Sequence, residues 1–390
     1  LKLANIPTNE LPSTVPKDDR DVVLCQFKMS FRVVLWQPVS AENIMKNKEV
    51  HFYVNVSDIN DVKAELNRST IPYKVLMDNV QGVIKKQTVN DTVSPRSSSS
   101  YYEQYHSLNE IYSWMEEITE INADLLQKIY IGSSFEKRPL YILKVQDRTP
   151  KSAIWIDCGI HAREWIAPAF CLWFIGHTTH FREKDQIMTR LLQHLDFYVM
   201  PVMNVDGYEY TWTTNRLWRK SRSKHGNNRC IGTDMNRNFD AGWCGKGASH
   251  NDCHEIYCGP YPESEPEVKA VAHFLQKHKD HTKAYITIHS YSQMVLFPYS
   301  YTTNKSKDHD ELVSAKVASN NLFPFLSPTD LAPGGSDDWA YDLGIKYSFT
   351  FELRDRGTHG FLLPTNLIKP TCIEALSGIK TIALHVINNI

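Results

Sequence analysis

The feature that most constrains the fold is an alternation of strand-like and helix-like segments from residue 97 to residue 390. The apolar runs AIWIDCGI and DFYVMPV are typical of strands buried on both faces, and AYITIH and KYSFTFEL indicate two more strands. YIGSSFEKRPLYILKV predicts a hairpin, and PEVKAVAHFLQKH predicts a helix that Pro266 and Glu267 open. This alternation predicts an α/β domain with a doubly wound, mixed and mostly buried sheet.

A break in composition precedes this region. Residues 90–100, NDTVSPRSSSS, combine Pro with a run of Ser and predict an exposed linker in which a trypsin-like protease could cleave after Arg96. An ordinary surface loop is the alternative. Before the linker, FRVVLWQPV, VHFYVNV and IPYKVLMDNV predict strands, and SDINDVKAEL predicts a helix. The first 96 residues are therefore expected to contain a small α+β domain, with no structure predicted for residues 1–24.

Charge and hydropathy exclude two classes of partner. The 43 Lys and Arg residues nearly balance the 44 Asp and Glu residues, which leaves a net charge of -1. Electrostatic attraction therefore gives no reason to expect nucleic acid or an anionic membrane as the main partner. No apolar run reaches the ~18 residues of a membrane span. We expect a soluble protein with no nucleic-acid or membrane partner.

Cysteine placement suggests a disulfide framework. Six of the eight cysteines lie between residues 158 and 258, and only Cys25 and Cys372 stand apart. Reduced thiols are the alternative, and six cysteines allow about 15 pairings, so sequence alone selects none. Four Asn-X-Ser/Thr triplets are candidate glycosylation sites and favour a secreted protein; they begin at Asn55, Asn67, Asn90 and Asn304. The chain has no initiator Met or signal peptide, so we expect a processed or truncated form of a secreted precursor.

Three potential metal ligands follow predicted strands. His161 and Glu164 lie on the turn after AIWIDCGI, and His289 ends AYITIH. Open α/β sheets place functional groups at the carboxyl ends of their strands, so these side chains could converge. Two His and one Glu that leave a position for an activated water form a catalytic zinc arrangement. The alternative is a surface His and Glu near a helix start, with His289 hydrogen-bonded in a core.

Further polar residues occur where burial or binding would need them. Glu352 lies near the end of a mostly buried strand, where a carboxylate requires a partner or a purpose; an ion pair with Arg354 or another arginine is the alternative. Arginines and Asn236 in NRLWRKSR and CIGTDMNRNFD suit recognition of a carboxylate and stabilisation of an oxyanion, namely Arg216, Arg219 and Arg237. Solvent-exposed basic loops are the alternative. Asp234 could accept the ring proton of a ligating histidine.

Taken together, HAREW, NRLWRK, DMNRN, IHSYSQ and FELRD occur in the order found in the pancreatic-type zinc metallocarboxypeptidases, which the chain resembles from about Phe31 to Ile390. WQPV and NDTVSPR are most similar to the B-type proenzymes of plasma. The resemblance implies an activation domain of residues 1–96 that shields a catalytic domain of residues 97–390. It also implies an eight-stranded catalytic sheet and release of the activation domain by cleavage after Arg96.

The same resemblance assigns roles residue by residue. It implies one Zn²⁺ held by His161, Glu164 and His289, with Glu352 as the general base and Arg219 on the oxyanion. It implies substrate contacts from Arg163, Asn236, Arg237, Ser290, Tyr291 and Asp337, with Asp234 beside a zinc histidine. It implies the disulfides Cys158–Cys171, Cys230–Cys253 and Cys244–Cys258.

In this family, an Asp at the position of Asp337 pairs with a substrate Lys or Arg, which implies B-type specificity. The alternative is a solvated Asp-Asp turn in which Asp338 only caps. The chain also departs from the family. The stretch from Ser290 to Asp330 is shorter by about a dozen residues, roughly three helical turns. Asp330 replaces a mobile tyrosine that hydrogen-bonds the substrate carboxylate, and a carboxylate there would repel that group.

We therefore expect a secreted, extracellular plasma zymogen. A trypsin-like protease would activate it to remove Lys or Arg from peptide and protein C-termini, including those of fibrin, which would dampen fibrinolysis. Two alternatives follow from the shortened stretch. One is a catalytically impaired zinc-binding decoy, and the other is an enzyme that prefers apolar C-terminal residues.

Overall fold

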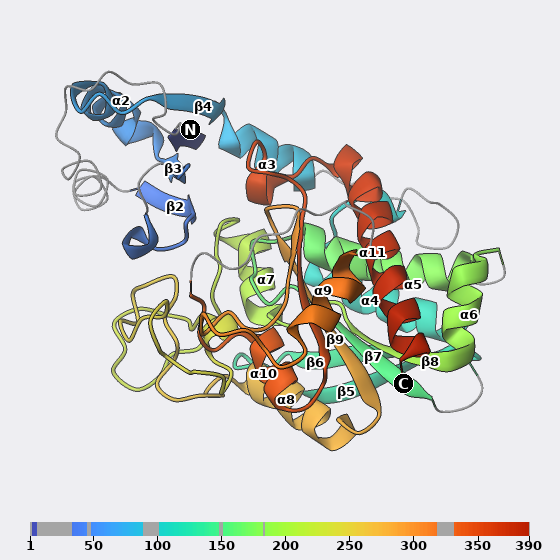
Figure 1. Ribbon diagram of the computed structural model, residues 1–390. Helices are drawn as coiled ribbons and strands as arrows, with labels where there is room; N and C mark the ends of the chain where they lie inside the picture. Colours follow the sequence, from blue (N-terminus) through green and yellow to red (C-terminus); the bar gives the residue numbers. More distant parts are fainter. Residues whose placement is uncertain are drawn as a thin grey trace.

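The computed structural model describes residues 2–5, 33–44, 48–88, 101–147, 151–181, 184–317 and 331–389 (Figure 1). Four residues that carry earlier predictions lie outside these ranges: Cys25, Asn90, Arg96 and Asp330. The expected cleavage after Arg96, the glycosylation of Asn90 and the role of Asp330 in place of the family's tyrosine therefore stay predictions.

A mixed seven-stranded sheet forms the centre of the larger domain, in the order β10-β11-β9-β7-β8-β6-β5. The four strands β11, β9, β7 and β8 run parallel, whereas β10, β6 and β5 each pair antiparallel with a neighbour. The strands are β5 (Leu126–Ser133), β6 (Pro139–Val145), β7 (Ser152–Cys158), β8 (Leu195–Met200), β9 (Thr282–Ser290), β10 (Met294–Leu296) and β11 (Tyr347–Leu353). All of β7 except Ser152, and all of β8, are buried, as near-continuous apolar runs require.

The expected α/β class and mixed sheet are confirmed, but the described residues contain seven strands of this sheet where the resemblance implied eight. The eighth strand had no counterpart among the apolar segments of the sequence. Conversely, the three-residue β10 was not predicted, because so short a strand lacks a measurable alternation of apolar and polar residues.

Helices cover both faces of the sheet. Figure 1 shows α5 and α11 on one side and α8 and α10 on the other. The helices of this domain are α4 (Leu108–Ile121), α5 (Ile166–Phe181), α6 (Gln186–His194), α7 (Val205–Thr213), α8 (Pro266–His278), α9 (His309–Val317), α10 (Ser336–Asp342) and α11 (Ile368–Asn388). Helix α8 begins and ends where its sequence predicts, with Pro266 in its first turn. No described helix combines the length and the apolar character that a bilayer crossing needs.

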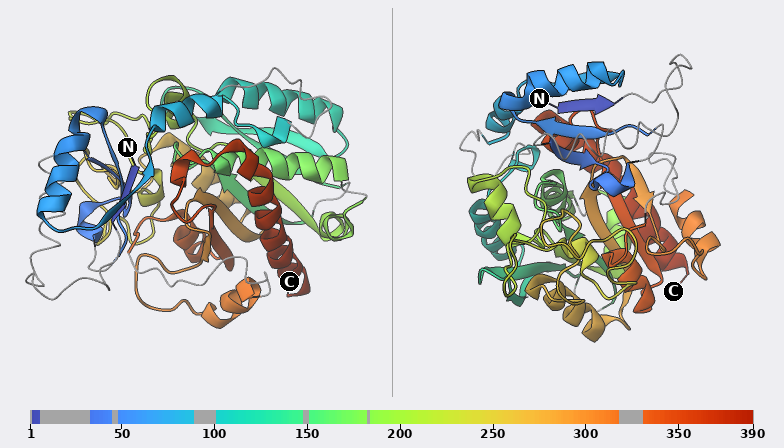
Figure 2. Two further views of the ribbon diagram at one scale, coloured as in Figure 1. Left: turned by 90° about the horizontal axis from the view of Figure 1, so that it is seen from above. Right: turned by 90° about the vertical axis from the view of Figure 1, so that its left-hand side faces the viewer.

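The N-terminal domain is a second, smaller unit, which Figures 1 and 2 show in blue beside the larger domain. Its four-stranded sheet has the order β2-β3-β1-β4, and neighbouring strands in this order are antiparallel. Its elements are β1 (Lys2–Asn5), β2 (Val33–Gln37), β3 (His51–Val54), α2 (Ile59–Arg68), β4 (Tyr73–Met77) and α3 (Val80–Thr88). Strand β1 comes from a segment for which no structure was predicted. Helix α3 was missed, and it begins at the residue where the predicted third strand was expected to end.

In the larger domain, a buried carboxyl group on α8, beneath the β5-β6 hairpin, makes stability depend on pH. Glu267 accepts a hydrogen bond from Phe135 N at 3.0 Å through Oε1, while its Oε2 has no hydrogen-bond partner among the described residues. Burial, followed by repulsion from Glu265, raises the pKa of Glu267 to about 8. The folded chain therefore holds a proton that the unfolded chain releases above its ordinary pKa of about 4.3. This contribution to stability is complete at low pH and is lost as the pH rises from about 4.3 toward 8.

Glu267→Gln keeps the oxygen that accepts from Phe135 N. We expect this variant to raise the melting temperature at pH 8 by several degrees, since each kcal/mol of stability corresponds to about 2–4 °C. At pH 5 the melting temperature should change little. Glu265→Gln is the matched control, because His225, Ser223 and Ser221 donate to Glu265 and hold its pKa below the ordinary value. It should lower the melting temperature. A Glu267→Gln protein that melts below the parent at pH 8 contradicts the prediction.

Candidate active site

Three adjacent parallel strands deliver the central residues of the site. His161 and Glu164 follow the end of β7, His289 lies near the end of β9, and Glu352 lies near the end of β11. In the register of β9 and β11, Glu352 stands opposite His289. The carboxyl ends of the strands therefore meet where the sequence predicts, because parallel neighbours end at one edge of the sheet.

His161, Glu164 and His289 converge as a set of metal-binding groups. The Nδ1 atoms of the two histidines lie 3.1 Å apart. Glu164 Oε1 lies 2.8 Å from His161 Nδ1, and Glu164 Oε2 lies 3.2 Å from His289 Nδ1. All three residues are buried, and one ligand atom from each lies within 4.8 Å of the others. Two imidazoles and one carboxylate are the donor set of a catalytic zinc site.

Electrostatics also favour a cation here. Burial would lower the pKa of His289, but the Glu164 carboxylate overcomes it and raises the pKa to about 9. His289 Nε2 is buried and has no hydrogen-bond partner among the described residues. Two facing ring nitrogens beside a buried carboxylate attract positive charge, so these residues fit Zn²⁺.

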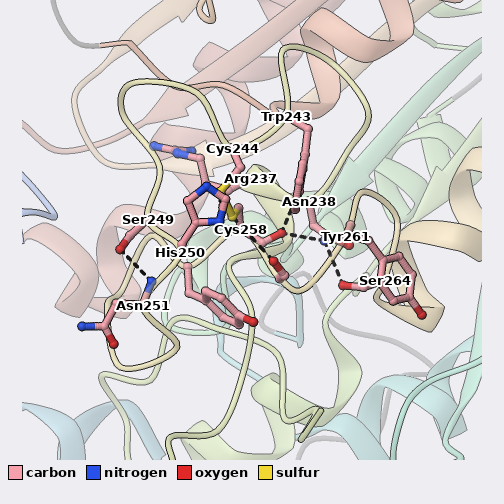
Figure 3. Close-up of a disulfide and its surroundings, with 12 residues drawn as sticks. Arg237, Asn238, Trp243, Cys244, Ser249, His250, Asn251, Cys258, Tyr261 and Ser264 are labelled. Atoms are coloured by element: carbon pink, nitrogen blue, oxygen red, sulfur yellow. Dashed lines mark hydrogen bonds between the residues drawn. A yellow bond between two sulfur atoms is a disulfide. The ribbon is translucent and has the colours of Figure 1, made fainter. Parts of the chain in front are cut away.

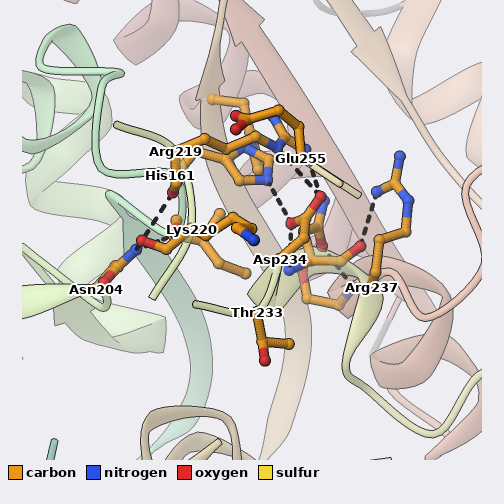
Figure 4. Close-up of polar contacts among 12 residues, drawn as sticks. His161, Asn204, Arg219, Lys220, Thr233, Asp234, Arg237 and Glu255 are labelled. Carbon is orange, nitrogen blue, oxygen red and sulfur yellow. Dashed lines mark hydrogen bonds and ion pairs between the residues drawn. The ribbon is translucent and has the colours of Figure 1, made fainter. Parts of the chain in front are cut away.

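Asp234 orients one of the candidate ligands (Figure 4). It immediately precedes the short 3-10 helix η4 (Met235–Arg237), and its Oδ1 accepts from His161 Nε2 at 3.1 Å. A carboxylate of this kind can only accept, so Nε2 holds the ring proton and Nδ1 presents its lone pair. Asp234 Oδ2 accepts from Arg219 Nε at 3.1 Å and from Arg219 Nη2 at 2.8 Å. Burial alone would raise the pKa of Asp234, but Arg219 and His161 hold it well below its usual range.

Glu352 is available for proton transfer because another residue satisfies Arg354. Arg354 Nε donates to Glu374 Oε2 at 2.7 Å, which removes the alternative of an ion pair between Arg354 and Glu352. Glu352 lines a cavity of about 240 Å³. Burial raises the pKa of Glu352 to about 8. A carboxyl group with a pKa near neutrality can both take up and release a proton.

The cavity gathers most of the predicted substrate-binding groups. It is lined by His161, Glu164, Arg219, Asn236, Arg237, His289, Ser290, Tyr291, Asp337, Thr350 and Glu352, among others. The Ser290 hydroxyl is buried without a hydrogen-bond partner among the described residues. Asn236 Oδ1 accepts from Ser336 N at 3.0 Å, which ties η4 to the first residue of α10. Thr350 was not predicted as part of the site, although its position two residues before Glu352 places both on one face of β11.

The two neighbouring aspartates on α10 have different partners. Asp337 is 5% exposed, lines the cavity, and accepts from Thr350 Oγ1 at 2.9 Å. Burial raises its pKa, and it forms no ion pair with any described residue. Asp338 is fully buried and accepts from Ser300 N, Ser300 Oγ and Tyr301 N instead. The alternative of a solvated turn is therefore wrong. Asp337 faces the cavity, and Asp338 holds the 300–301 loop.

Two predicted binding arginines do not line the cavity. Arg216 is buried over the Trp165 ring at 3.7 Å and donates to the carbonyls of Arg163 and Phe361, both at 2.7 Å. It supports the fold, so the prediction that it recognises a carboxylate is not supported. Arg163 is fully buried, with its guanidinium 4.2 Å from the Phe361 ring centroid and 3.7 Å from Glu255. Burial lowers the pKa of Arg163 to about 10.

The N-terminal domain covers the cavity. Five of its residues complete the lining: Trp36, Gln37, Pro38, Val39 and Asn43. His51 Nδ1 lies 2.9 Å from the Tyr291 hydroxyl, and the ring of Trp36 packs against Phe361 with centroids 5.2 Å apart. Gln87 on α3 donates to Leu363 O at 2.8 Å and accepts from Arg216 Nε at 3.3 Å. The sequence did not reveal these contacts individually, because WQPV was interpreted only as the end of a predicted strand and as a point of resemblance to the B-type proenzymes.

The three disulfides implied by the resemblance are present: Cys158–Cys171, Cys230–Cys253 and Cys244–Cys258. Cys372 is a buried free thiol. The three glycosylation candidates within the described ranges are exposed, namely Asn55, Asn67 and Asn304. Three disulfides in one domain are typical of proteins that fold in an oxidising compartment.

Comparison with known proteins agrees with this geometry. The zinc carboxypeptidase family model matches residues 111–378, and the carboxypeptidase activation peptide model matches residues 16–87. Carboxypeptidase B2 of Rattus norvegicus is 63% identical over 97% of this chain and 93% of its own length. Carboxypeptidase B2 of Homo sapiens is 58% identical over 98% and 94%, respectively. A crystal structure of thrombin activatable fibrinolysis inhibitor superposes with a TM-score of 0.94 at 56% identity, covering 100% of this chain and 99% of that one.

Proposed function

The chain belongs to the zinc carboxypeptidase family, and from that premise we propose that it is a secreted zymogen which, after cleavage at Arg96, removes C-terminal Lys and Arg from peptides and proteins. The carrying observation is that three groups arranged to hold a metal ion, a carboxyl group of raised pKa and a buried carboxylate with no ion pair among the described residues share one cavity. A domain that matches carboxypeptidase activation peptides covers that cavity.

Substrate binding follows from the charges in the cavity. We assign the terminal carboxylate of the substrate to Arg237 and Asn236, because a guanidinium beside an amide offers several donors to a carboxylate. This contact restricts hydrolysis to the last peptide bond of a chain. Asp337 receives the basic side chain, since a buried carboxylate without an ion pair gains most from a fixed cation. Neutral side chains would leave this carboxylate unpaired and are rejected.

The chemical step then uses three further side chains, those of Glu352, Arg219 and Asp234. His161, Glu164 and His289 would hold the zinc ion, which would supply Lewis acidity toward the scissile carbonyl and the attacking water. Glu352 accepts a proton from the attacking water and delivers it to the leaving amine. Arg219 faces the developing oxyanion, and Asp234 holds its guanidinium through Nε and Nη2. Asp234 also keeps the proton of His161 on Nε2, away from the ligand position.

The N-terminal domain prevents this reaction in the uncleaved chain. It lines the cavity with the segment from Trp36 to Val39 and contacts the Tyr291 hydroxyl through His51. Cleavage after Arg96 cuts the covalent connection between the domains, so that the N-terminal domain can dissociate. The contacts of Gln87 with Leu363 and Arg216 are among those that must break.

Three disulfides and the exposed sequons support an extracellular location. The names of the relatives support two finer proposals. A thrombin-like protease activates the zymogen, and basic C-termini exposed on fibrin are among its substrates, so that the enzyme dampens fibrinolysis.

The decisive experiment treats the purified chain with trypsin and measures amino acids released from peptides that end in Arg, Phe or Leu. We expect release of Arg only after trypsin treatment, with about one zinc per chain by elemental analysis. A chelator should abolish release, and an Arg96→Gln variant should resist activation. No release despite stoichiometric zinc favours the binding decoy. Preferential release of Phe or Leu favours an enzyme for apolar C-termini.

A further inference from the structure

The loop between Cys244 and Cys258 lies beside the proposed carboxylate-binding arginine, Arg237 (Figure 3). It contains turns and isolated bridges but no helix or strand. The disulfide joins its two ends across 14 residues of sequence. A loop with so little regular backbone hydrogen bonding depends on cross-links for its conformation.

Gly247, which follows Cys244 by three residues, contacts Arg237 directly. Arg237 Nε donates to Gly247 O at 3.1 Å, and Arg237 Nη1 donates to Asn236 O at 2.9 Å. Nη2 has no hydrogen bond to any described residue, and Arg237 lines the cavity. Because a guanidinium is planar, two bonds from adjacent nitrogens fix its plane and leave the remaining donors for a ligand.

The position of the Gly247 carbonyl is itself tightly set. Its backbone has a φ of +105°, and a Cβ added there would lie 1.9 Å from Leu331 O. Only glycine fits such a position without strain. The two arms of the loop pair near the disulfide, where Ser249 N donates to Ile256 O and Cys258 N donates to Ser249 O, both at 3.0 Å.

The far end of the loop is anchored to the segment that carries Arg237. Cys258 is fully buried, and its carbonyl accepts from Asn238 Nδ2 at 2.8 Å and from Trp243 Nε1 at 3.0 Å. Asn238 directly follows η4. The disulfide thus connects the arm that carries Gly247 to a fixed point next to Arg237. Figure 3 shows Cys244 and Cys258 close to Arg237 and Asn238.

We propose that Gly247, held by the Cys244–Cys258 disulfide, is a positioning residue for Arg237, so that affinity for the substrate carboxylate depends on this disulfide. The inference rests on the proposed function and deepens it. The terminal carboxylate stays bound throughout hydrolysis, so its contact with Arg237 contributes equally to the ground state and the transition state. Loss of such a contact raises KM and leaves kcat nearly unchanged.

The test compares two variants and a control after trypsin activation. Gly247→Ala keeps the disulfide but displaces the carbonyl, and Cys244→Ala/Cys258→Ala removes the cross-link. Each should raise KM for a C-terminal Arg peptide and the Kd of free L-arginine about tenfold, as expected for one hydrogen bond. We expect kcat within about twofold and unchanged zinc content. Cys230→Ala/Cys253→Ala is the control, because it cuts a different cross-link to this loop and should leave KM unchanged.

Folded variants whose KM and Kd stay within twofold of the parent overturn the inference. An equal rise in KM in the Cys230→Ala/Cys253→Ala control also overturns it, because the effect would then come from a general loss of order in the loop. If the Cys244→Ala/Cys258→Ala protein does not fold, Gly247→Ala decides the question. If the parent enzyme releases no Arg, the proposed function fails, whereas L-arginine binding by the parent and the variants still tests the positioning role.

Discussion

Glu352→Gln in the activated enzyme is expected to lower kcat by about 10³-fold, within the range measured for loss of a general acid or base. Gln has nearly the same shape as Glu but cannot take a proton from water or deliver it to the leaving amine. Zinc content should stay stoichiometric, because His161, Glu164 and His289 form the metal-binding set without Glu352. The measurements are kcat on a C-terminal Arg peptide and elemental analysis of the same sample.

Glu374→Gln serves as the matched control. Glu374 is the ion-pair partner of Arg354, the residue that directly follows β11. Glu374 does not line the cavity. It should leave kcat within about twofold, because a partly exposed ion pair contributes little. A Glu352→Gln enzyme that retains more than a tenth of the parent kcat, or that loses its zinc, would falsify the assignment of Glu352 as the base.

Asp337→Asn is expected to produce the second large effect, a change of specificity. The variant should lose about 10²- to 10³-fold in kcat/KM for C-terminal Arg, in line with the cost of breaking a buried hydrogen-bonded charge pair. Its activity on C-terminal Leu should hold or rise, because no buried carboxylate then remains unpaired. The ratio of kcat/KM for the two peptides measures the effect without interference from a change in active-enzyme concentration.

Asp338→Asn controls for damage to α10. Asp338 is adjacent and buried, but its partners are Ser300 and Tyr301, and its Oδ2 accepts three of these hydrogen bonds. An Asn that keeps this oxygen in place should preserve the preference for Arg. If Asp338→Asn changes the ratio as much as Asp337→Asn does, or if Asp337→Asn still prefers Arg, then the base of the specificity pocket lies elsewhere.

The chemistry of the site could be predicted from sequence because strand periodicity and strand ends determine it. His161, His289 and Glu352 each come at or just after a strongly patterned strand, and parallel strands bring such positions together. The roles of Asp337 and Asp338 could not be separated in this way. Adjacent helical residues point in different directions, and only the folded chain shows that one faces the cavity and the other the 300–301 loop.

The contacts between domains were the least predictable part. Gln87 and Arg216 are 129 residues apart in sequence, and nothing in either segment indicates that the two side chains meet. Arg216 was interpreted as a ligand-binding group because arginine is common at such sites. Its actual partners are an indole ring, two backbone carbonyls and the side chain of Gln87, and no sequence pattern encodes them. The short strand β10 and helix α3 were missed for a related reason, since packing rather than periodicity determines short elements.

The pairing of β9 with β11 has a consequence for how this enzyme can change. Glu352 and His289 are partners in the register of the neighbouring strands β11 and β9. The spacing between these two strands, about 4.8 Å, therefore determines the separation of the two Cα atoms. Apart from Ser290 and Thr350, the other walls of the cavity belong to other parts of the chain, including Tyr291, Leu331 and Asp337. Insertions, deletions and substitutions between residues 291 and 346 can therefore change which substrate side chain is bound without changing the spacing of the reacting groups. Substrate choice can thus evolve separately from catalytic power.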